Sequence, residues 1–382
     1  MTRRSGFRMS WVLVLLLLAV RTVAATHVPP LLVGAFNVQV FGDSKSSKPA
    51  VMERLVAIVR RYDLLLVQEV RDVDGSAIAQ LLREVNAEYD GAGFKLLLGE
   101  RLGRTNSKEQ YAWFYREAKV RPADFAVSAV PDPEDTWERE PMLVYWDTTP
   151  AVIKPTSSTP SSSESAAIAV DARHILATLG IHVDPDEAVM EIDALVDPVD
   201  KALAGGRAGL GILVMGDLNA DCSYVTKTEW ACIREESCST TRMRLWNPDK
   251  YVWLLNDTVD TTTSNTHCAY DRFVFAPPAG EHCADPLCGG RISGVGIYDF
   301  QAALGLTQEE AKDVSDHFPI ELRMRLNDPE AEESERDDVD KTSEGERRWT
   351  FMCTIAAVVI AMILLESKGR DLCVIQFDGD LN

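Results

Sequence analysis

The sequence predicts a layered α/β fold in which two β-sheets pack together and helices cover their outer faces. Short apolar runs typical of buried strands alternate along the chain with segments whose apolar residues recur at helical spacing. The length of 382 residues allows one large domain with appendages, or two average domains. A hydrophobic content of 46% with 26% charged residues is ordinary for globular chains and excludes global disorder.

The first part of the chain predicts three strands and two helices. Residues 31–40 have a strand pattern, and the apolar residues of 52–59 share one helical face before the buried strand 64–68. The apolar residues of 78–85 again repeat at helical spacing, and 111–115 is the third strand. Because the expected helices lie between strands in the sequence, they are predicted to cover a sheet face.

The second part continues the same alternation. Residues 175–182 are strand-like, and Asp184 or Asp186 can cap a following helix whose apolar stripe runs over 188–199. Further strands are expected at 212–215, at 273–275 and at 320–326, where apolar and polar residues alternate strictly.

The N-terminal segment, residues 1–25, has the three parts of a signal peptide. Basic residues precede the apolar run 11–20, and small residues at 23–25 form a cleavage site. An uncleaved anchor is the alternative, which the short apolar run disfavours. The chain is therefore expected in the secretory pathway, where disulfides are permitted.

The C-terminal segments are expected to lie outside the body of the protein, residues 26–327. Residues 328–348 form an acidic stalk too poor in apolar residues to bury a core. The uncharged run 349–365 is predicted to cross a membrane once, with 366–382 as a short tail. A lipid-anchor signal ends with its apolar segment, whereas here residues 366–382 follow the apolar run, so a lipid anchor is disfavoured. The expected location is extracellular or at the cell surface.

The charge of the chain restricts its function. The formal net charge is −20, and the body stays acidic once the basic leader and the acidic stalk are set apart. Such a body is not a nucleic-acid binder of the basic-patch kind. If it acts on phosphates, it must recruit positive charge from metal ions.

Polar side chains stand at the ends of several predicted strands. Glu69 closes one buried strand, His182 follows another, Asp217 and Asn219 follow a third, and Asp316-His317 precedes the last. Singly, Asp217 could cap a turn and His182 could be a core histidine. Together, acid, amide and imidazole groups at strand ends indicate a metal-assisted active site.

At these residues the chain resembles the deoxyribonuclease I-like secreted endonucleases, over about Leu31 to Leu326. The resemblance implies a four-layer α/β/β/α sandwich of two packed mixed sheets with outer helices. The motifs that carry it are AFNVQVFG (35–42), VRRYDLLLVQEVRD (59–72), LGRTNSKEQYAWFYR (102–116), REP (139–141), MGDLNADCSYV (215–225), CAYDR (268–272) and SDHFPIE (315–321).

The resemblance implies a pair of catalytic histidines. His317 would be the general base that deprotonates water, and His182 the general acid that protonates the departing 3′ oxygen. Glu109 would orient His182, and Asp271 would orient His317.

It also implies Mg²⁺ (or Mn²⁺) ligands and DNA contacts. Glu69 and Asp316 match metal ligands, and Mg²⁺ favours such oxygen groups. Asn37, Asp217 and Asn219 would surround the scissile phosphate. Arg71 and Arg139 fit groove and phosphate contacts, with surface ion pairing as the alternative.

Structural Ca²⁺ is the second metal that the resemblance implies. Asp260, Thr262 and Thr266 match one site, although a DTTTS loop is equally an ordinary turn. A second site would use Asp135 and Glu140 with the carbonyl of Trp137, in a loop that differs from the family pattern. Separately, the sequence Asn256-Asp257-Thr258 is an N-glycosylation sequon.

Six cysteines fall within the body, and their pairing cannot be read from spacing. Cys222 and Cys268 match a bridge of the family, and local bridges 232–238 and 283–288 are guesses. The small family disulfide before REP is missing, since 131–138 holds no cysteine. In addition, Ser107 stands where the family has an aromatic residue, which affects DNA affinity rather than chemistry.

The resemblance thus implies a monomeric, secreted or surface-tethered endonuclease that cuts mainly double-stranded DNA and leaves 5′-phosphate ends. One alternative is a phospholipid or sphingomyelin phosphodiesterase of the same superfamily, suggested by the tether. Another is a non-catalytic, surface DNA-binding relative. The motifs QEVR and NADCSYV favour DNA over lipid, and the complete set of acids and histidines disfavours a non-catalytic protein.

Overall fold

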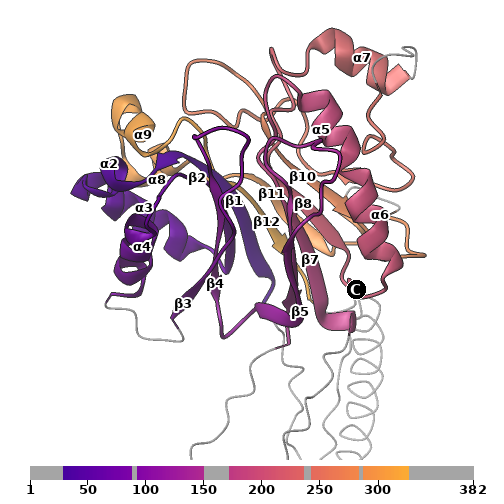
Figure 1. Ribbon diagram of the computed structural model, residues 1–382, viewed down its shortest axis with the longest axis horizontal. Coiled ribbons are helices and arrows are strands. Elements are labelled where there is room, and N and C mark those ends of the chain that lie inside the picture. Colours follow the sequence, from indigo (N-terminus) through magenta and orange to yellow (C-terminus); the bar gives the residue numbers. More distant parts are fainter. Residues whose placement is uncertain (1–28, 88–92, 150–171, 236–241, 284–286, 327–382) are drawn as a thin grey trace, which may run out of the picture. The chain divides into compact units, whose positions relative to one another are not determined.

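The computed structural model describes residues 29–87, 93–149, 172–235, 242–283 and 287–326 (Figure 1). These residues form two six-stranded sheets. The first has the order β11 (Ile292–Ile297), β12 (Ile320–Met324), β1 (Leu31–Phe41), β2 (Leu64–Val70), β4 (Gln110–Arg116) and β3 (Phe94–Leu98). The second has the order β5 (Arg121–Ala129), β6 (Met142–Asp147), β7 (Ile175–Gly180), β8 (Ile212–Asp217), β10 (Asp271–Ala276) and β9 (Val252–Trp253).

Both sheets are mixed. β1 pairs with β2 in parallel and β7 pairs with β8 in parallel, whereas the neighbouring pairs are antiparallel. Apolar side chains of both sheets form one buried cluster, with Val33, Leu66 and Trp113 from the first and Leu176 and Phe273 from the second. The sheets therefore pack face to face, and the predicted sandwich of two mixed sheets is confirmed.

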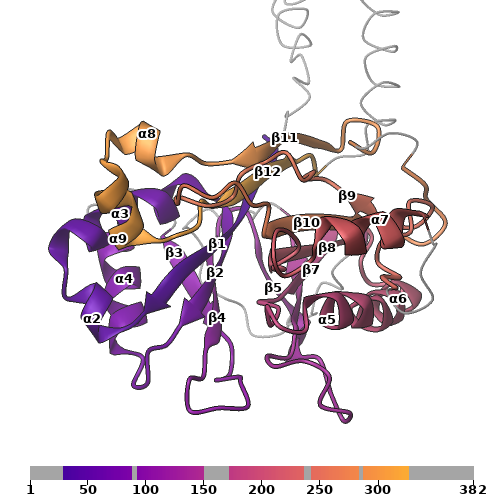
Figure 2. The ribbon, with the colours of Figure 1, turned by 90° about the horizontal axis from the view of Figure 1, so that it is seen from above.

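Helices cover the two outer faces, as the views in Figures 1 and 2 show. On the first sheet lie α2 (Asp43–Ser46), α3 (Pro49–Arg61), α4 (Ser76–Asn86), α8 (Phe300–Leu304) and α9 (Gln308–Val314). On the second lie α5 (Ala188–Ala194), α6 (Val196–Ala204) and α7 (Lys227–Glu235). Each helical layer buries its own cluster, so four layers enclose three apolar interfaces.

The predicted helix over 188–199 is two helices rather than one. Pro198 has no N–H to donate to the carbonyl of Ala194, so the α-helical ladder is interrupted where α5 ends and α6 begins. The capping expectation is also wrong, because the N-cap of α5 is Glu187 and no side chain caps it. Asp184 instead accepts from the backbone N–H of Asp186 in the preceding turn.

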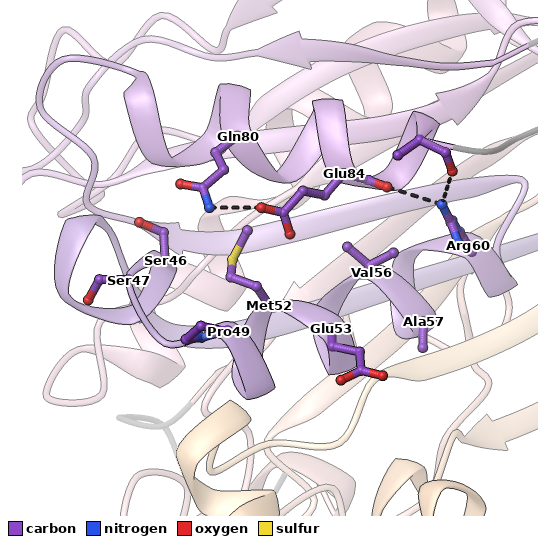
Figure 3. Close-up of a pocket in the computed structure, with 11 residues that line it drawn as sticks. Ser46, Ser47, Pro49, Met52, Glu53, Val56, Ala57, Arg60, Gln80 and Glu84 are labelled. Atoms are coloured by element: carbon purple, nitrogen blue, oxygen red, sulfur yellow. Dashed lines mark hydrogen bonds between the residues drawn. The ribbon is translucent and has the colours of Figure 1, made fainter.

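The helices on the first sheet are tied together by polar contacts. Figure 3 shows the groove between α3 and α4, where Gln80 donates to Glu84 and Arg60 reaches the end of α4. Arg60 donates to the carbonyls of Glu84, Val85 and Ala87 at the C-terminal end of α4, where helix carbonyls lack the next turn of N–H donors. A cation at a helix C-terminus also interacts favourably with the helix dipole.

Disulfides brace the second sheet and its loops. Cys222 and Cys268 are bonded, with their Cα atoms 5.8 Å apart, as the resemblance implied. Cys283 and Cys288 form the guessed local bridge. Cys232 is disulfide-bonded too, and Cys238 lies outside the described residues.

The predicted terminal segments fall where the structure describes nothing. The signal peptide 1–25, the stalk 328–348, the membrane-spanning run 349–365 and the tail 366–382 all lie outside the described residues. Within the part that is described, no helix is long and apolar enough to cross a membrane. The predicted tether lies outside that part of the chain and stays a prediction.

Candidate active site

The polar residues predicted at strand ends gather at one edge of the sandwich. Asn37 and Glu69 lie toward the C-terminal ends of β1 and β2, and His182 and Asp217 stand at the corresponding ends of β7 and β8. Nδ2 of Asn37 donates to Oε1 of Glu69 and to Oδ2 of Asp217, each over 3.0 Å. One amide thus joins the acids of the two sheets.

The β7–β8 end of this edge is tightly packed. Gly216 precedes Asp217 with φ +135°, and a Cβ there would lie 2.2 Å from the carbonyl oxygen of Ile181. Gln68 fills the adjacent space, donating to that carbonyl over 2.6 Å and accepting from the N–H of Asp217 over 3.1 Å. Only glycine fits this approach, which sets Asp217 between the sheets.

The first imidazole–carboxylate pair is His182 with Glu109. Nδ1 of His182 donates to Oε2 of Glu109 over 2.8 Å, and both residues are buried. Arg71 donates to Oε1 of Glu109 over 2.8 Å, and Nη1 of Arg139 lies 3.8 Å from the same oxygen. Burial opposes it, but the hydrogen bond and charge of His182, followed by the charges of Arg139 and Arg71, lower the pKa of Glu109 to about 2.

The pKa of His182 is set by opposing neighbours. Burial and the charge of Arg139 lower it, whereas the hydrogen bond and charge of Glu109 raise it, and the net shift is upward. The backbone around the ring is fixed as well. Its N–H donates to Oη of Tyr111 over 3.0 Å, and its carbonyl accepts from Nε of Arg139 over 3.0 Å.

The second pair is His317 with Asp271. Nδ1 of His317 donates to Oδ2 of Asp271 over 2.7 Å, and both residues are buried. Burial lowers the pKa of His317, but the charges of Asp271, Asp217 and Asp316 outweigh it and raise the pKa to about 10. In contrast to the first pair, the charged groups that raise the pKa here are all carboxylates.

Asp217 stands between the two rings. Its Oδ2 lies 3.7 Å from Nε2 of His182 and 3.5 Å from Nε2 of His317. Despite burial, both imidazoles lower the pKa of Asp217, and the backbone N–H of Asn219 donates to its Oδ1 over 3.0 Å. Two proton-carrying nitrogens therefore converge on one spot, as an acid–base displacement requires.

The predicted Mg²⁺ ligands are held by residues of β1. The oxygens of Glu69 accept from Nδ2 of Asn37 and from the N–H of Val40. Oδ2 of Asp316 accepts from Nε2 of Gln39 over 3.0 Å. Oδ1 of Asp316 is buried and has no hydrogen-bond partner within the described part of the chain. An unpartnered buried carboxylate oxygen fits a hard divalent cation.

A second group of metal-capable atoms lies nearby. One atom each of Asp217, Asp271 and His317 falls within 4.8 Å of the others. However, Nδ1 of His317 is already bonded to Asp271, which explains this closeness without an ion. Glu69 and Asp316 are the better candidates because Asp316 has an oxygen to spare.

The two arginines differ in their exposure. Arg139 is buried and bonded to the backbone of His182, so the surface ion-pair alternative does not describe it. The side chain of Arg71 is 32% exposed and donates to Oγ of Ser107 over 2.9 Å as well as to Glu109. The residue that replaces the family's aromatic side chain thus contacts the predicted groove-binding arginine.

The first predicted Ca²⁺ set does come together. Oδ1 of Asp260 accepts from the N–H and Oγ1 of Thr262, and Oγ1 of Thr262 donates to the carbonyl of Thr266 over 2.9 Å. This is an all-oxygen donor set of the kind that Ca²⁺ binds.

The second predicted Ca²⁺ set is occupied by an arginine. Nε of Arg104 donates to Oδ1 of Asp135 over 3.0 Å, and Nη2 donates to the carbonyl of Asp135. No contact between Asp135 and Glu140 is seen among the described residues. A guanidinium already neutralises Asp135, so this set does not fit Ca²⁺ as the first one does.

Several residues at the site were not predicted. Gln39, Gln68, Tyr111 and Ser315 each bond a candidate site residue or its backbone. Lys45 bonds the carbonyls of Val38 and Val314, which lie next to Asn37 and two residues before Asp316. Gln68 had a signal, since an amide closing a buried apolar run needs partners. The other residues lie within ordinary strand, helix or loop patterns, and nothing in the sequence marks them as part of the site.

The chain is similar to several known proteins. Residues 34–317 match the model of the Endonuclease/Exonuclease/phosphatase family. Deoxyribonuclease-1-like 2 of Homo sapiens is 35% identical over 328 residues, covering 82% of this chain and 98% of the relative. Deoxyribonuclease-1 of Sus scrofa is 34% identical over 296 residues, covering 77% of this chain and 91% of the relative. Among solved structures, a humanized D. rerio TDP2 is similar with a TM-score of 0.47 and 11% identity, covering 77% of this chain and 98% of that chain.

Proposed function

The chain belongs to the Endonuclease/Exonuclease/phosphatase family, in its deoxyribonuclease I-like branch, and from this premise we propose that it is an endonuclease hydrolysing DNA phosphodiesters. The observation that carries the proposal is the convergence of His182 and His317 on Asp217, at 3.7 and 3.5 Å. Each ring is bonded at Nδ1 to its own carboxylate, which leaves Nε2 free to exchange a proton with substrate.

In this mechanism the two rings act on opposite sides of the phosphate. Nε2 of His317 accepts a proton from the attacking water, and the imidazolium that forms is stabilised by Asp271. Nε2 of His182 donates its proton to the departing 3′ oxygen, so the cleaved strand keeps a 5′ phosphate. Charge is conserved, because one imidazole gains the proton that the other loses.

The remaining site residues orient the phosphate. Asn37 and Asn219 fix the carboxylate of Asp217, and Arg139 fixes the backbone of His182. Glu69 and Asp316 would hold Mg²⁺ or Mn²⁺. When bound, that ion supplies positive charge to the phosphate and offsets the carboxylate field around His317.

The proposed substrate is double-stranded DNA, in line with the names of the relatives. Arg71 would enter the groove, its exposed end held by Glu109 and Ser107. The alternatives, lipid phosphodiester hydrolysis and DNA binding without cleavage, find no feature of the described residues that favours them. We also propose an extracellular or cell-surface location, with Ca²⁺ at Asp260 and a glycan at the exposed Asn256.

The experiment is nicking of supercoiled plasmid by the purified protein, with and without Mg²⁺ and Ca²⁺. Labelled sphingomyelin and phospholipid vesicles are assayed in parallel. Mg²⁺-dependent nicking with 5′-phosphate ends supports the proposal. Hydrolysis of lipid alone would assign the alternative reaction, and binding of DNA without any cleavage would assign the non-catalytic one.

A further inference from the structure

Lys45 is a buried ammonium group beneath the candidate site. It lies on the short helix α2, directly after β1, and is 9% exposed. Its Nζ donates to the carbonyl of Val38 over 2.7 Å and to the carbonyl of Val314 over 2.8 Å. Burying a charged group costs free energy of folding even when it has two hydrogen-bond acceptors. The mechanism above gives Lys45 no role.

The two carbonyls belong to the segments that carry the predicted cation ligands. Val38 lies between Asn37, which contacts Glu69, and Gln39, which contacts Asp316. Val314 ends α9, two residues before Asp316. Lys45 therefore joins the end of β1 to the segment that leads into β12.

Two other hydrogen bonds join the same segments, and in both the donor group is uncharged. Oγ of Ser315 donates to the carbonyl of Asn37 over 2.6 Å, and Nε2 of Gln39 donates to Asp316 over 3.0 Å. Lys45 adds the only cation that bonds both backbones among the described residues. The charges of Asp316 and Glu69 act favourably on it, against a burial effect that lowers the pKa of Lys45 to about 8.

The backbone that Lys45 holds is in a strained conformation. Gln39 and Val40 have φ of +48° and +53°, in the left-handed region that side chains with a branched Cβ avoid. This turn directs the side chain of Gln39 to Asp316 and the N–H of Val40 to Glu69. Such a turn persists only where its surroundings over-determine it.

We propose that Lys45 is a positioning residue that sets the spacing of Glu69 and Asp316 and so the divalent-cation affinity of the site. The inference rests on the proposed function, since it concerns the same site. Residues behind metal ligands typically change metal affinity or activity about 10- to 100-fold when they are removed. Lys45 acts on the ligands through the backbone of β1 and of the α9–β12 connection.

The test compares Lys45→Met with Lys48→Met in the full chain. Lys48 is the matched control, because its side chain is 51% exposed and its ammonium group pairs, within the described part of the chain, with Asp313 alone, at 3.2 Å. Mn²⁺ affinity is measured from the electron paramagnetic resonance signal of the free ion. Plasmid nicking gives kcat and KM. All measurements are made at a temperature well below the melting temperature of each variant.

Lys45→Met is expected to bind Mn²⁺ about 10- to 100-fold more weakly and to lose a similar factor in kcat, with KM for DNA within about twofold. Lys48→Met should match the wild type in each measurement. Wild-type Mn²⁺ affinity in folded Lys45→Met overturns the inference while leaving the proposed function in place. A wild type that neither binds Mn²⁺ nor nicks DNA overturns both.

A measurement on the wild type covers the case in which Lys45→Met does not fold. Hydrogen exchange of the amides in residues 44–48 is followed with and without Mg²⁺. If Lys45 couples α2 to the site, Mg²⁺ should slow exchange there together with exchange at 315–317. Protection of 315–317 with unchanged exchange at 44–48 would overturn the inference.

Discussion

The two imidazole–carboxylate pairs have the same internal geometry but opposite surroundings. The bonds from Nδ1 to carboxylate are 2.8 Å for His182 and 2.7 Å for His317. Around the first pair lie the guanidinium groups of Arg71 and Arg139, and around the second lie further carboxylates. The pKa of His317 is accordingly raised to about 10, whereas Arg139 opposes the rise of the pKa of His182.

This difference shows how one motif can serve two roles. Each ring has its own bonded carboxylate, so the difference between the two pKa values comes from the further charges around each pair. The pair next to Asp316 is the one that a bound cation would affect most, because the carboxylate field that raises the pKa of His317 would be neutralised there. The pair next to Arg139 already has a fixed positive neighbour. The following predictions break or sharpen this contrast.

Removing either ring should have the largest effect. His182→Ala and His317→Ala are each expected to lower kcat for plasmid nicking about 10²- to 10⁴-fold, the usual contribution of general acid–base groups. The double variant should lose little more, since groups that act in one displacement are not additive. Circular dichroism checks that each variant is folded. Turnover near that of the wild type in either single variant would contradict the proposed mechanism.

Exchanging the carboxylates should come next. Glu109→Gln removes the partner that raises the pKa of His182 most and leaves the ring between Arg139 and Asp217, so the pKa of that ring should fall. Asp271→Asn should lower the pKa of His317 but leave it raised, because Asp217 and Asp316 remain. Titration of the two imidazoles by NMR measures both shifts. If the pKa of His182 in Glu109→Gln stayed further above its ordinary value than the pKa of His317 in Asp271→Asn, the contrast between the two pairs would be wrong.

A smaller difference between the two pairs is expected in how the free energy of unfolding depends on acid pH. The pKa of Glu109 is about 2 in the folded protein and ordinary in the unfolded chain. The unfolded state therefore binds more protons, and this stabilisation is present above about pH 4.5 and lost as pH falls through about 2. Glu109→Gln should flatten the fall in unfolding free energy across that window, by roughly 3 kcal/mol at most.

Asp271→Asn is the control for this measurement. Burial raises the pKa of Asp271, so it does not contribute an acid-labile stabilisation of the same sign. Urea unfolding between pH 5 and 2 follows the variants in parallel. An identical slope in wild type and Glu109→Gln would show that folding does not lower the pKa of Glu109.

The smallest effect is expected at the calcium set, beyond both pairs. Millimolar Ca²⁺ should raise the melting temperature of the wild type, because an ion that binds only the folded state stabilises it. The rise should shrink in Asp260→Ala and persist in Asp135→Ala, since Arg104 already pairs with Asp135. An undiminished response in Asp260→Ala would place the ion elsewhere.

The sequence pattern predicted the layers and the strand ends well. Buried strands such as Leu64–Val70 and Ile212–Asp217 are continuous apolar runs, and the polar residue that follows each run marks the active edge. The sequence pattern was misleading where an apolar stripe continues through a residue that cannot make the backbone hydrogen bond of a helix. The stripe over 188–199 continues through Pro198, but the hydrogen-bond ladder does not.

The edge strands and supporting residues were beyond the sequence for other reasons. β5 and β9 lie at sheet edges, where one flank has no strand partner and the apolar pattern is weak. Lys45 sits in a stretch of polar residues that is typical of a solvated helix, and only tertiary packing buries it. Ser315 and Gln39 are likewise defined by partners far away in the chain.

The pairing of β6 with β7 has a practical consequence for protein engineering. Met142 pairs with Gly180 at the active edge, and Asp147 pairs with Ile175 at the opposite end of the same ladder. The connection between these strands therefore leaves and re-enters the sandwich away from the chemistry, closed by the bond from the N–H of Thr148 to the carbonyl of His174. A fluorescent label attached at the exposed His174 would report on the protein from the end of the ladder opposite to the candidate site.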